Sequence, residues 1–226
     1  SLNEKGVYAL SVDPLDGSSN IETNAPIGTI FSIYVANSKP EHSVLQKGEL
    51  QLAAGFFIYG PRTILVLTFG SGTMAFQLNK NKHFMLLNEK LVIKEITSEF
   101  AINMSNYRHW TFETREYIDN CLQGIEGKNK KNYNMRWIGS LVADAWRIFT
   151  RGGIFLYPED FRKGYENGRL RLVYEANAIA FLVEQACGEA SNGFERILNM
   201  KPKSLHQRTS LIFGSKNEVT MIVKNK

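Results

Sequence analysis

Asp13-Pro14-Leu15-Asp16-Gly17-Ser18-Ser19-Asn20 carries more information about fold and chemistry than any other stretch of this sequence. Its two carboxylates, Asp13 and Asp16, stand three residues apart around a Pro-Leu pair. Pro14 fixes its own φ and favours an extended conformation for the residue before it. The two carboxylates can therefore converge across a bend, with the backbone carbonyl of Leu15 facing the same point. Hard divalent cations such as Mg²⁺ prefer carboxylate and carbonyl oxygens, so this stretch predicts a metal site.

The glycine and the two serines after the second aspartate predict an anion site beside the metal site. Gly17 lets the backbone approach a ligand closely, and the N–H groups of Gly17, Ser18 and Ser19 can point at a phosphate. Asp-Pro and Asp-Gly are also ordinary turn formers, so a purely structural loop is the alternative. The apolar runs at residues 7–12 and 30–35 are typical of buried strands. A charged loop at the end of a strand in a layered α/β domain is where ligands bind, which favours a functional site.

Composition restricts the classes of protein to which the chain can belong. With 226 residues and 43% hydrophobic content, it is typical of a globular protein of one large or two small domains. We expect no membrane partner, because no apolar run approaches the length of a span and no signal peptide is visible. The net charge is +5, but the basic residues are scattered, which argues against nucleic acid and fits an anionic substrate. The two cysteines, Cys121 and Cys187, suggest no disulfide framework and predict a cytoplasmic protein.

The order of the local patterns predicts an α/β (α+β layered) fold. The first part of the chain is rich in strands, with a meander predicted at residues 53–59, 63–69, 73–78 and 83–87. Later patterns alternate, with helices predicted at residues 111–122, 140–150 and 172–187 and strands at 154–157 and 211–213. We therefore predict two layered subdomains, residues 1–93 and residues 94–226. Ser215 and Glu218 predict a capping box for a short terminal helix.

Glu175 is the third candidate for a metal ligand. It lies near the start of the apolar helix predicted at residues 172–187. A carboxylate among such residues is costly to bury unless it is paired or bound to a cation. A charge favoured by the dipole at the start of a helix is an equally good interpretation of the sequence alone.

Several motifs resemble one known family. Asp-Pro-Leu-Asp-Gly-Ser is the signature of the metal-dependent, lithium-sensitive sugar and inositol phosphatases. Six blocks resemble class I fructose-1,6-bisphosphatases, occur in that family's order and cover nearly the whole chain. They are residues 13–20 with 28–34 (GTIFSIY), 53–56 (AAGF), 59–61 (YGP), 100–106 (FAINMSN), 152–158 (GGIFLYP) and 168–177 (GRLRLVYEAN).

The resemblance implies a sugar-phosphatase fold with mixed β-sheets flanked by helices, in an α/β/α/β/α-type arrangement. It implies Mg²⁺-dependent hydrolysis of the 1-phosphate of fructose 1,6-bisphosphate, a step of gluconeogenesis, with Mn²⁺ or Zn²⁺ as possible replacements. The catalytic residues would be Asp13, Asp16 and Glu175, and the metal ligands these three together with the Leu15 carbonyl. A paired-metal site of this kind clamps a phosphoryl group for transfer to water.

The resemblance also implies residues that bind the rest of the substrate. Besides Asp16, Gly17, Ser18 and Ser19, the matching positions are Asn103, Arg136, Tyr157 and Arg169. Arginine offers a planar fork for phosphate, while asparagine and tyrosine offer neutral hydrogen bonds. A surface or capping role is the alternative for each. In the family, the arginine that matches Arg136 reaches into the neighbouring subunit's site, which implies a homo-oligomer, a tetramer.

Some positions depart from the family's pattern. Trp137 and Asn106 replace tyrosines that bind phosphate or substrate, and Arg169 replaces a lysine. The family's AMP site uses basic residues where this chain has Val7 and Val35. Valine cannot pair with phosphate, so we predict weak or absent inhibition by AMP.

The chain begins at Ser1, in the middle of the family's pattern, and we expect it to lack an N-terminal part with further acidic residues. Residues 1–226 alone are then predicted to show weak or no activity. Three alternatives stay open: a sedoheptulose-1,7-bisphosphatase, an inositol phosphatase, and an inactive fragment that binds phosphosugars.

Overall fold

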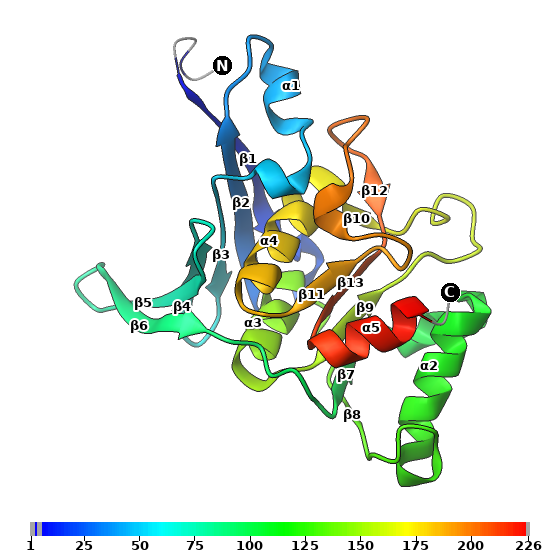
Figure 1. Ribbon diagram of the computed structural model, residues 1–226. Helices are drawn as coiled ribbons and strands as arrows, with labels where there is room; N and C mark the ends of the chain where they lie inside the picture. The colour runs from blue at the N-terminus through cyan, green and yellow to red at the C-terminus, as the bar shows by residue number, and fades with distance from the viewer. Residues whose placement is uncertain (1–2, 4–5, 225–226) are drawn as a thin grey trace.

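The computed structural model describes residue 3 and residues 6–224 and shows two stacked β-sheets with helices between them (Figure 1). The first is a six-stranded antiparallel meander in the order β1-β2-β3-β4-β5-β6. Its strands are β1 (Tyr8–Asp16), β2 (Ile27–Val35), β3 (Ala53–Tyr59), β4 (Thr63–Thr68), β5 (Thr73–Leu78) and β6 (Phe84–Leu91). The predicted meander is confirmed, since alternating apolar residues separated by glycine and asparagine turns form hairpins.

The second sheet is mixed and has five short strands in the order β11-β13-β9-β7-β8. They are β7 (Glu99–Ala101), β8 (Asn134–Met135), β9 (Ile154–Tyr157), β11 (Glu189–Ser191) and β13 (Leu211–Gly214). Strand β7 runs parallel to β8 and β9, while β13 runs antiparallel to β9 and β11. A separate two-stranded sheet joins β10 (Leu170–Arg171) to β12 (Arg208–Thr209).

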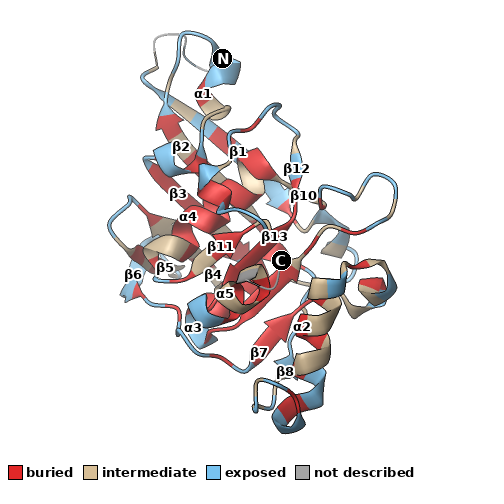
Figure 2. Cartoon of the chain, turned by 45° about the vertical axis from the view of Figure 1, so that its right-hand side comes forward, coloured by how far each residue is buried: buried red, intermediate tan, exposed pale blue. Residues whose placement is uncertain are grey.

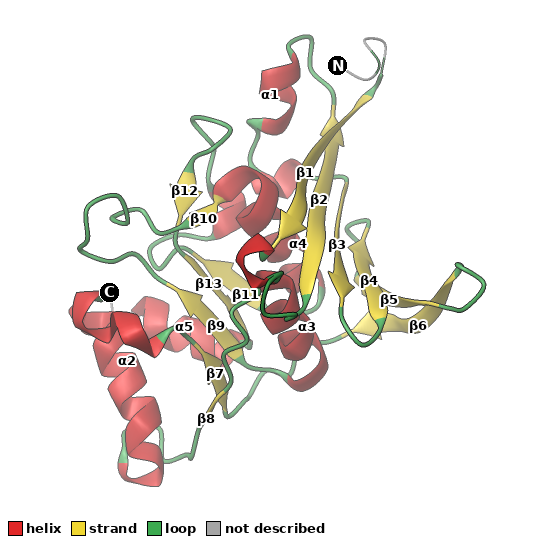
Figure 3. Ribbon diagram, turned by 180° about the vertical axis from the view of Figure 1, so that it is seen from behind, coloured by secondary structure: helices red, strands yellow, loops and turns green. Residues whose placement is uncertain are grey.

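Five α-helices accompany the sheets within the described part of the chain. The central pair, α3 (Leu141–Arg151) and α4 (Asn177–Gln185), lies between the two large sheets, and α4 is almost wholly buried (Figures 1 and 2). On the far side of the second sheet lie α2 (Phe112–Gln123) and α5 (Lys216–Lys224), while α1 (Pro40–Val44) is a short turn after β2. Figure 3 shows the same layers from behind. Mixed sheets flanked by helices confirm the predicted fold class.

Two apolar cores hold these layers together. The larger one fills the space around α3 and α4, with Phe56 and Ile30 on one side and Phe155 on the other. The smaller one packs α2 and α5 on the outer face of the second sheet around Trp110 and Ile212. The linker between β6 and β7 contains residue 93, where we predicted a subdomain boundary, and that division stays a prediction.

One prediction about a helix end is wrong. Ser215 and Glu218 do not form a capping box, because both side chains bind other partners. The Ser215 hydroxyl accepts a hydrogen bond from the Gly153 N–H at 3.1 Å. The Glu218 carboxylate is turned into the smaller core, where it accepts hydrogen bonds from the Tyr117 hydroxyl at 2.7 Å and from Lys131 Nζ at 2.7 Å. A charged partner in a buried setting outweighs a local backbone cap.

Candidate metal and phosphate site

The end of β1 is bent by a bulge in its pairing with β2. Asp13 pairs with Ile30 and Asp16 with Gly28, so β1 carries one more residue than its partner over this interval. The Leu15 N–H donates to Asp13 Oδ1 at 3.0 Å, and the Pro14 carbonyl accepts from the Thr29 hydroxyl at 2.9 Å. A bulge re-aims side chains that would otherwise alternate across the sheet, so the two aspartates come to the same side.

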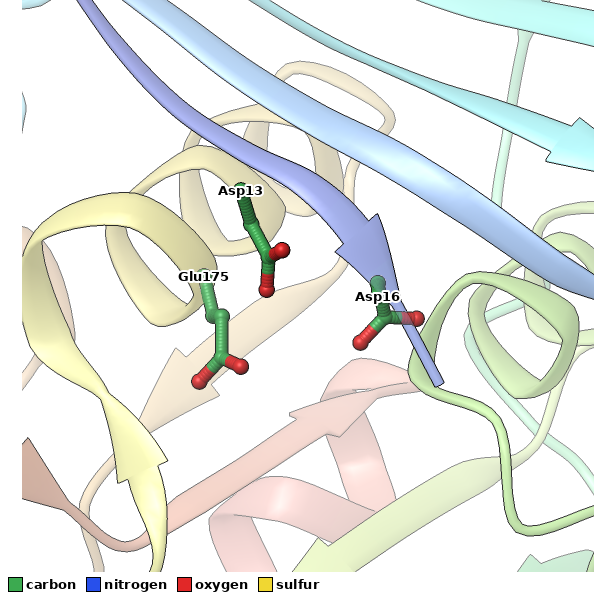
Figure 4. A group of neighbouring side chains, drawn as sticks. All are labelled: Asp13, Asp16 and Glu175. Atoms are coloured by element: carbon green, nitrogen blue, oxygen red, sulfur yellow. The ribbon is translucent and has the colours of Figure 1, made fainter. Parts of the chain in front are cut away.

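Glu175 approaches the two aspartates from the other side of the site (Figure 4). It lies on a π-helical turn, Leu172–Ala176, that runs directly into α4. One carboxylate oxygen from each of Asp13, Asp16 and Glu175 lies within 4.8 Å of the others. The predicted helix at residues 172–187 is therefore present, but its first turn is wider than an α-helix. Insertions of this kind occur often at functional sites.

The electrostatics of this cluster differ from those of exposed carboxylates. Asp16 is only 6% exposed, and burial raises its pKa to about 6, although a hydrogen bond from the Val142 N–H acts against the rise. Burial also raises the pKa of Glu175, and the charges of Asp16 and Asp13 push it further up. The three carboxylates lie close together in a site with little access to solvent, so their negative charges repel one another. A bound cation relieves this repulsion.

These residues fit a divalent metal ion. The donor set consists of carboxylate oxygens from two separate elements, which is the chemistry of a Mg²⁺ or Mn²⁺ site. The Glu175 side chain is held in place because its Oε2 accepts a hydrogen bond from the Arg171 N–H. The structure therefore brings together the three carboxylates that we predicted as metal ligands. Leu15 lies in the same bulge, between Asp13 and Asp16.

The residues after Asp16 form a tight turn against the start of α3. Gly17 has a φ of 77° and is followed by a 3-10 turn, Ser18–Asn20. Asn20 Nδ2 donates to the Gly139 carbonyl at 2.9 Å, which ties this turn to the residues before α3. Ser18 and Ser19 are exposed. The turn thus follows directly on Asp16, and its role as a phosphate site stays a prediction.

Helix α3 contributes its N-terminal end to the same place. Asp16 Oδ2 accepts a hydrogen bond from the Val142 N–H at 3.1 Å, within the first turn of the helix. The residues that precede α3 are themselves fixed, because the Ile138 and Gly139 N–H groups both donate to the Asp144 carboxylate at 3.2 Å. The N-terminal end of a helix carries partial positive charge and favours an anion nearby. The sequence predicted this helix but not its contact with Asp16.

The predicted substrate residues lie in two settings. Tyr157, at the end of β9, and Arg169 are close, with the guanidinium carbon 5.8 Å from the ring centre. Arg136 is exposed in the segment between β8 and α3. Asn103 caps a 3-10 turn, since its Oδ1 accepts hydrogen bonds from the Ser105 N–H at 3.2 Å and hydroxyl at 2.6 Å. Among the described residues, neither Asn103 nor Arg136 makes a hydrogen bond or ring contact with Tyr157 or Arg169.

The loop after β9 holds polar residues that no sequence motif marked. Asp160 is buried and accepts hydrogen bonds from Arg162, and it also lies 3.6 Å from Arg169 Nη2. Arg162 Nη2 donates to Asn106 Oδ1 at 2.8 Å, and both arginines lie against the Tyr165 ring. Burial acts to raise the pKa of Asp160, but hydrogen bonds from Arg162, with the charges of Arg162 and Arg169, hold it below its usual range. In the sequence, a charged loop with two arginines and two glycines is the feature that could have indicated these residues.

Comparisons with known proteins agree with this geometry. Residues 1–89 match the N-terminal domain of fructose-1-6-bisphosphatase, and residues 93–225 match its C-terminal domain. The chain belongs to the fructose-1,6-bisphosphatase family. The resemblance seen in the sequence motifs is thereby confirmed.

Relatives in this family are similar over nearly all of the chain. The class 1 fructose-1,6-bisphosphatase of Azorhizobium caulinodans is 54% identical over 98% of this chain and 69% of its own length. That of Rhizobium meliloti is 55% identical over 99% of this chain and 65% of its own length. The crystal structure of Leishmania major fructose-1,6-bisphosphatase in holo form superposes with a TM-score of 0.90 at 37% identity, over 97% of this chain and 69% of that one. The chain thus spans about two thirds of the length of these family members.

Proposed function

We propose that this protein catalyses the Mg²⁺-dependent hydrolysis of the 1-phosphate of fructose 1,6-bisphosphate, giving fructose 6-phosphate and inorganic phosphate. The observation that supports it best is the convergence of Asp13, Asp16 and Glu175, with ligand atoms within 4.8 Å, next to the Gly17–Asn20 turn. Membership of the fructose-1,6-bisphosphatase family supports the choice of substrate. The reaction belongs to carbohydrate metabolism, and we place it in gluconeogenesis.

The three carboxylates and the Leu15 carbonyl would hold the metal, for which Mg²⁺ is our first choice and Mn²⁺ or Zn²⁺ are alternatives. When bound, a divalent ion supplies positive charge for the phosphoryl oxygens and makes water more acidic. The chain's own residues do the positioning. Asp16 is fixed by the Val142 N–H, and Glu175 by the Arg171 N–H. Ligands fixed in this way keep their geometry while the substrate binds.

The phosphate to be cleaved would bind at the turn formed by Gly17, Ser18 and Ser19. Backbone N–H groups of such a turn, together with the N-terminal end of α3, can stabilise the negative charge on the transferring group. Water attacks the phosphorus, the bond between phosphorus and the sugar oxygen breaks, and the proton from water ends on that oxygen. The reaction needs no covalent enzyme intermediate.

Asn103, Arg136, Tyr157 and Arg169 are our candidates for binding the sugar and its second phosphate. Arg169 is held beside Tyr157 and over the Tyr165 ring, which pre-organises its planar fork. We propose that Arg136, which is exposed, reaches the site of a neighbouring subunit in a homotetramer.

We also propose that the protein works in the cytoplasm. Its two cysteines, Cys121 and Cys187, are both free, as suits a reducing compartment. No helix within residues 6–224 is long and apolar enough to cross a membrane.

Phosphate release from fructose 1,6-bisphosphate, measured with Mg²⁺ and with EDTA, tests the proposal. We expect release only with Mg²⁺. Sedoheptulose 1,7-bisphosphate and inositol phosphate serve as competing substrates in parallel. Faster turnover of either would replace the substrate in the proposal, and no release from any of the three would leave a binding role.

A further inference from the structure

Four buried polar side chains lie beneath the turn that carries Glu175. Ser32 and Tyr34 come from β2, and Asn177 is the first residue of α4. All three are 0% exposed, and Gln51, which follows the 3-10 turn Gly48–Leu50, is 5% exposed. The core around them is apolar. A polar group buried without a well-aligned partner costs about 1–3 kcal/mol, so apolar residues here would give a more stable fold.

Asn177 is held from two sides. Its backbone carbonyl accepts a hydrogen bond from Gln51 Nε2 at 2.9 Å, and the same nitrogen donates to the Gly48 carbonyl at 2.7 Å. Its side-chain amide lies beside the Tyr34 and Ser32 hydroxyls, but neither amide atom and neither hydroxyl makes a hydrogen bond with a residue that the structure describes, so the Asn177 side chain is fixed by packing. The fit is close, since a Cβ added at Gly48 would stand 2.7 Å from Asn177 Oδ1.

Asn177 also closes the turn on which Glu175 lies. Its backbone N–H donates to the Leu172 carbonyl, five residues back, and this bond makes the turn a π-helical one. At the other end, the Arg171 N–H donates to Glu175 Oε2. A shift of Asn177 would let this turn relax to the narrower α-helix. That change would rotate the side chains of the turn about the helix axis and so move the Glu175 carboxylate.

We propose that Asn177, hydrogen-bonded by Gln51 and packed beside Tyr34, is a positioning residue that keeps the π-helical turn in place and so aims Glu175 at the metal. The inference rests on the proposed metal site. Asn177 touches neither metal nor substrate in this arrangement and acts only through Glu175. Outer groups that orient a metal ligand typically change metal affinity by about 10- to 100-fold when removed.

The test compares two variants that each remove one buried tyrosine hydroxyl. Tyr34→Phe removes the group that faces Asn177. Tyr117→Phe is the control: Tyr117 is 2% exposed, and its hydroxyl donates to Glu218 in the smaller core. Mn²⁺ affinity is measured from the electron paramagnetic resonance signal of free Mn²⁺, and stability from thermal unfolding. We expect Tyr117→Phe to lose stability, since its hydroxyl has a partner, and Tyr34→Phe to lose little or none. We expect about tenfold weaker Mn²⁺ binding for Tyr34→Phe alone.

A second variant, Gly48→Ala, keeps every polar group. Its added Cβ would stand 2.7 Å from Asn177 Oδ1 and 2.7 Å from Leu198 Cδ2, the end of a flexible apolar side chain. It therefore displaces the Asn177 side chain without removing the Tyr34 hydroxyl, and it serves if Tyr34→Phe does not fold. We expect it also to weaken Mn²⁺ binding about tenfold. Wild-type Mn²⁺ affinity in the folded variants would overturn the positioning role and leave the proposed metal site intact. If the wild-type protein binds no Mn²⁺, both proposals fail.

Discussion

The Asp16 carboxylate accepts a hydrogen bond from the backbone N–H of Val142, 126 positions later in the chain, at 3.1 Å. This bond joins the end of β1 in the first sheet to the first turn of α3. It leaves the other carboxylate oxygen of Asp16 free to face Asp13 and Glu175. The metal site is therefore built across the contact between the meander and the helix layer, and its geometry depends on the packing of both.

Asp16→Asn should abolish most of the proposed activity while the protein stays folded. The amide can still accept the Val142 hydrogen bond, but it no longer carries the charge that a cation needs. We expect a loss on the order of 100- to 1000-fold in kcat, as for the removal of one preorganised electrostatic group. Phosphate release with Mg²⁺ is the measurement. Glu22→Gln is the matched control, because Glu22 is exposed and lies six residues away. Equal activity of the two variants would argue against Asp16 as a ligand.

Glu175→Gln should stabilise the metal-free protein at pH 8 and remove its response to Mg²⁺. Burial and the charges of Asp16 and Asp13 raise the pKa of Glu175, so its charged form is unfavourable in the folded state. A neutral amide removes that repulsion, and we expect a gain of about 1 kcal/mol in the free energy of unfolding, the scale of one pKa unit. Thermal unfolding with and without Mg²⁺ checks this. Mg²⁺ should raise the Tm of the wild-type protein only.

Local patterns predicted much of the fold and part of the site. The meander followed from apolar alternation, and the bend that gathers Asp13 and Asp16 followed from the proline between them. Glu175 was predicted as a metal ligand only from the resemblance of its motif to the family, because a charged residue near the start of a helix can also be favoured by the helix dipole. The sequence alone left both interpretations open.

The rest depends on contacts between distant segments. The Val142 N–H reaches Asp16 only after the sheet and α3 pack together. The π-helical turn at Glu175 has no simple pattern in its residues, and it is closed by Asn177 within the packed core. Glu218 matches a local cap, yet its carboxylate binds Lys131 because a charged partner is available in the folded chain. Each case is a tertiary contact that outweighs or completes a local preference.

The ion pairs of Glu99 should make stability depend on pH in the acid range. Hydrogen bonds from Arg151 and Arg147 hold the pKa of this buried carboxyl below its usual range. The stabilisation is therefore present above the unfolded-state pKa and is lost as the pH falls through the lower folded-state pKa. Glu99→Gln should cost about 2 kcal/mol at pH 7 and progressively less toward pH 3. Urea unfolding at several pH values measures it, with the exposed Glu95→Gln as the control that should change little.

AMP should not inhibit the enzyme at concentrations that inhibit AMP-sensitive family members. Val7 and Val35, which stand where basic residues would hold the AMP phosphate, are 65% and 55% exposed. Neither side chain can donate a hydrogen bond or neutralise a phosphate, so the expected effect on phosphate release is none. Marked inhibition by AMP would show that the nucleotide binds through other residues. A Val35→Arg variant gives the converse test, because it restores one positive charge at this position.

Arg162→Met should weaken substrate binding more than it slows the chemical step. Arg162 ties Asn106 to Asp160, and Asp160 also lies 3.6 Å from Arg169, so loss of this link frees the loop that holds Arg169. Loss of an interaction made equally in the ground and transition states raises KM and leaves kcat nearly unchanged. We expect a rise in KM of about tenfold, which corresponds to about 1.4 kcal/mol. Lys163→Met, at the exposed neighbouring position, is the matched control and should keep the wild-type KM. A fall in kcat with an unchanged KM would place Arg162 in the chemical step instead.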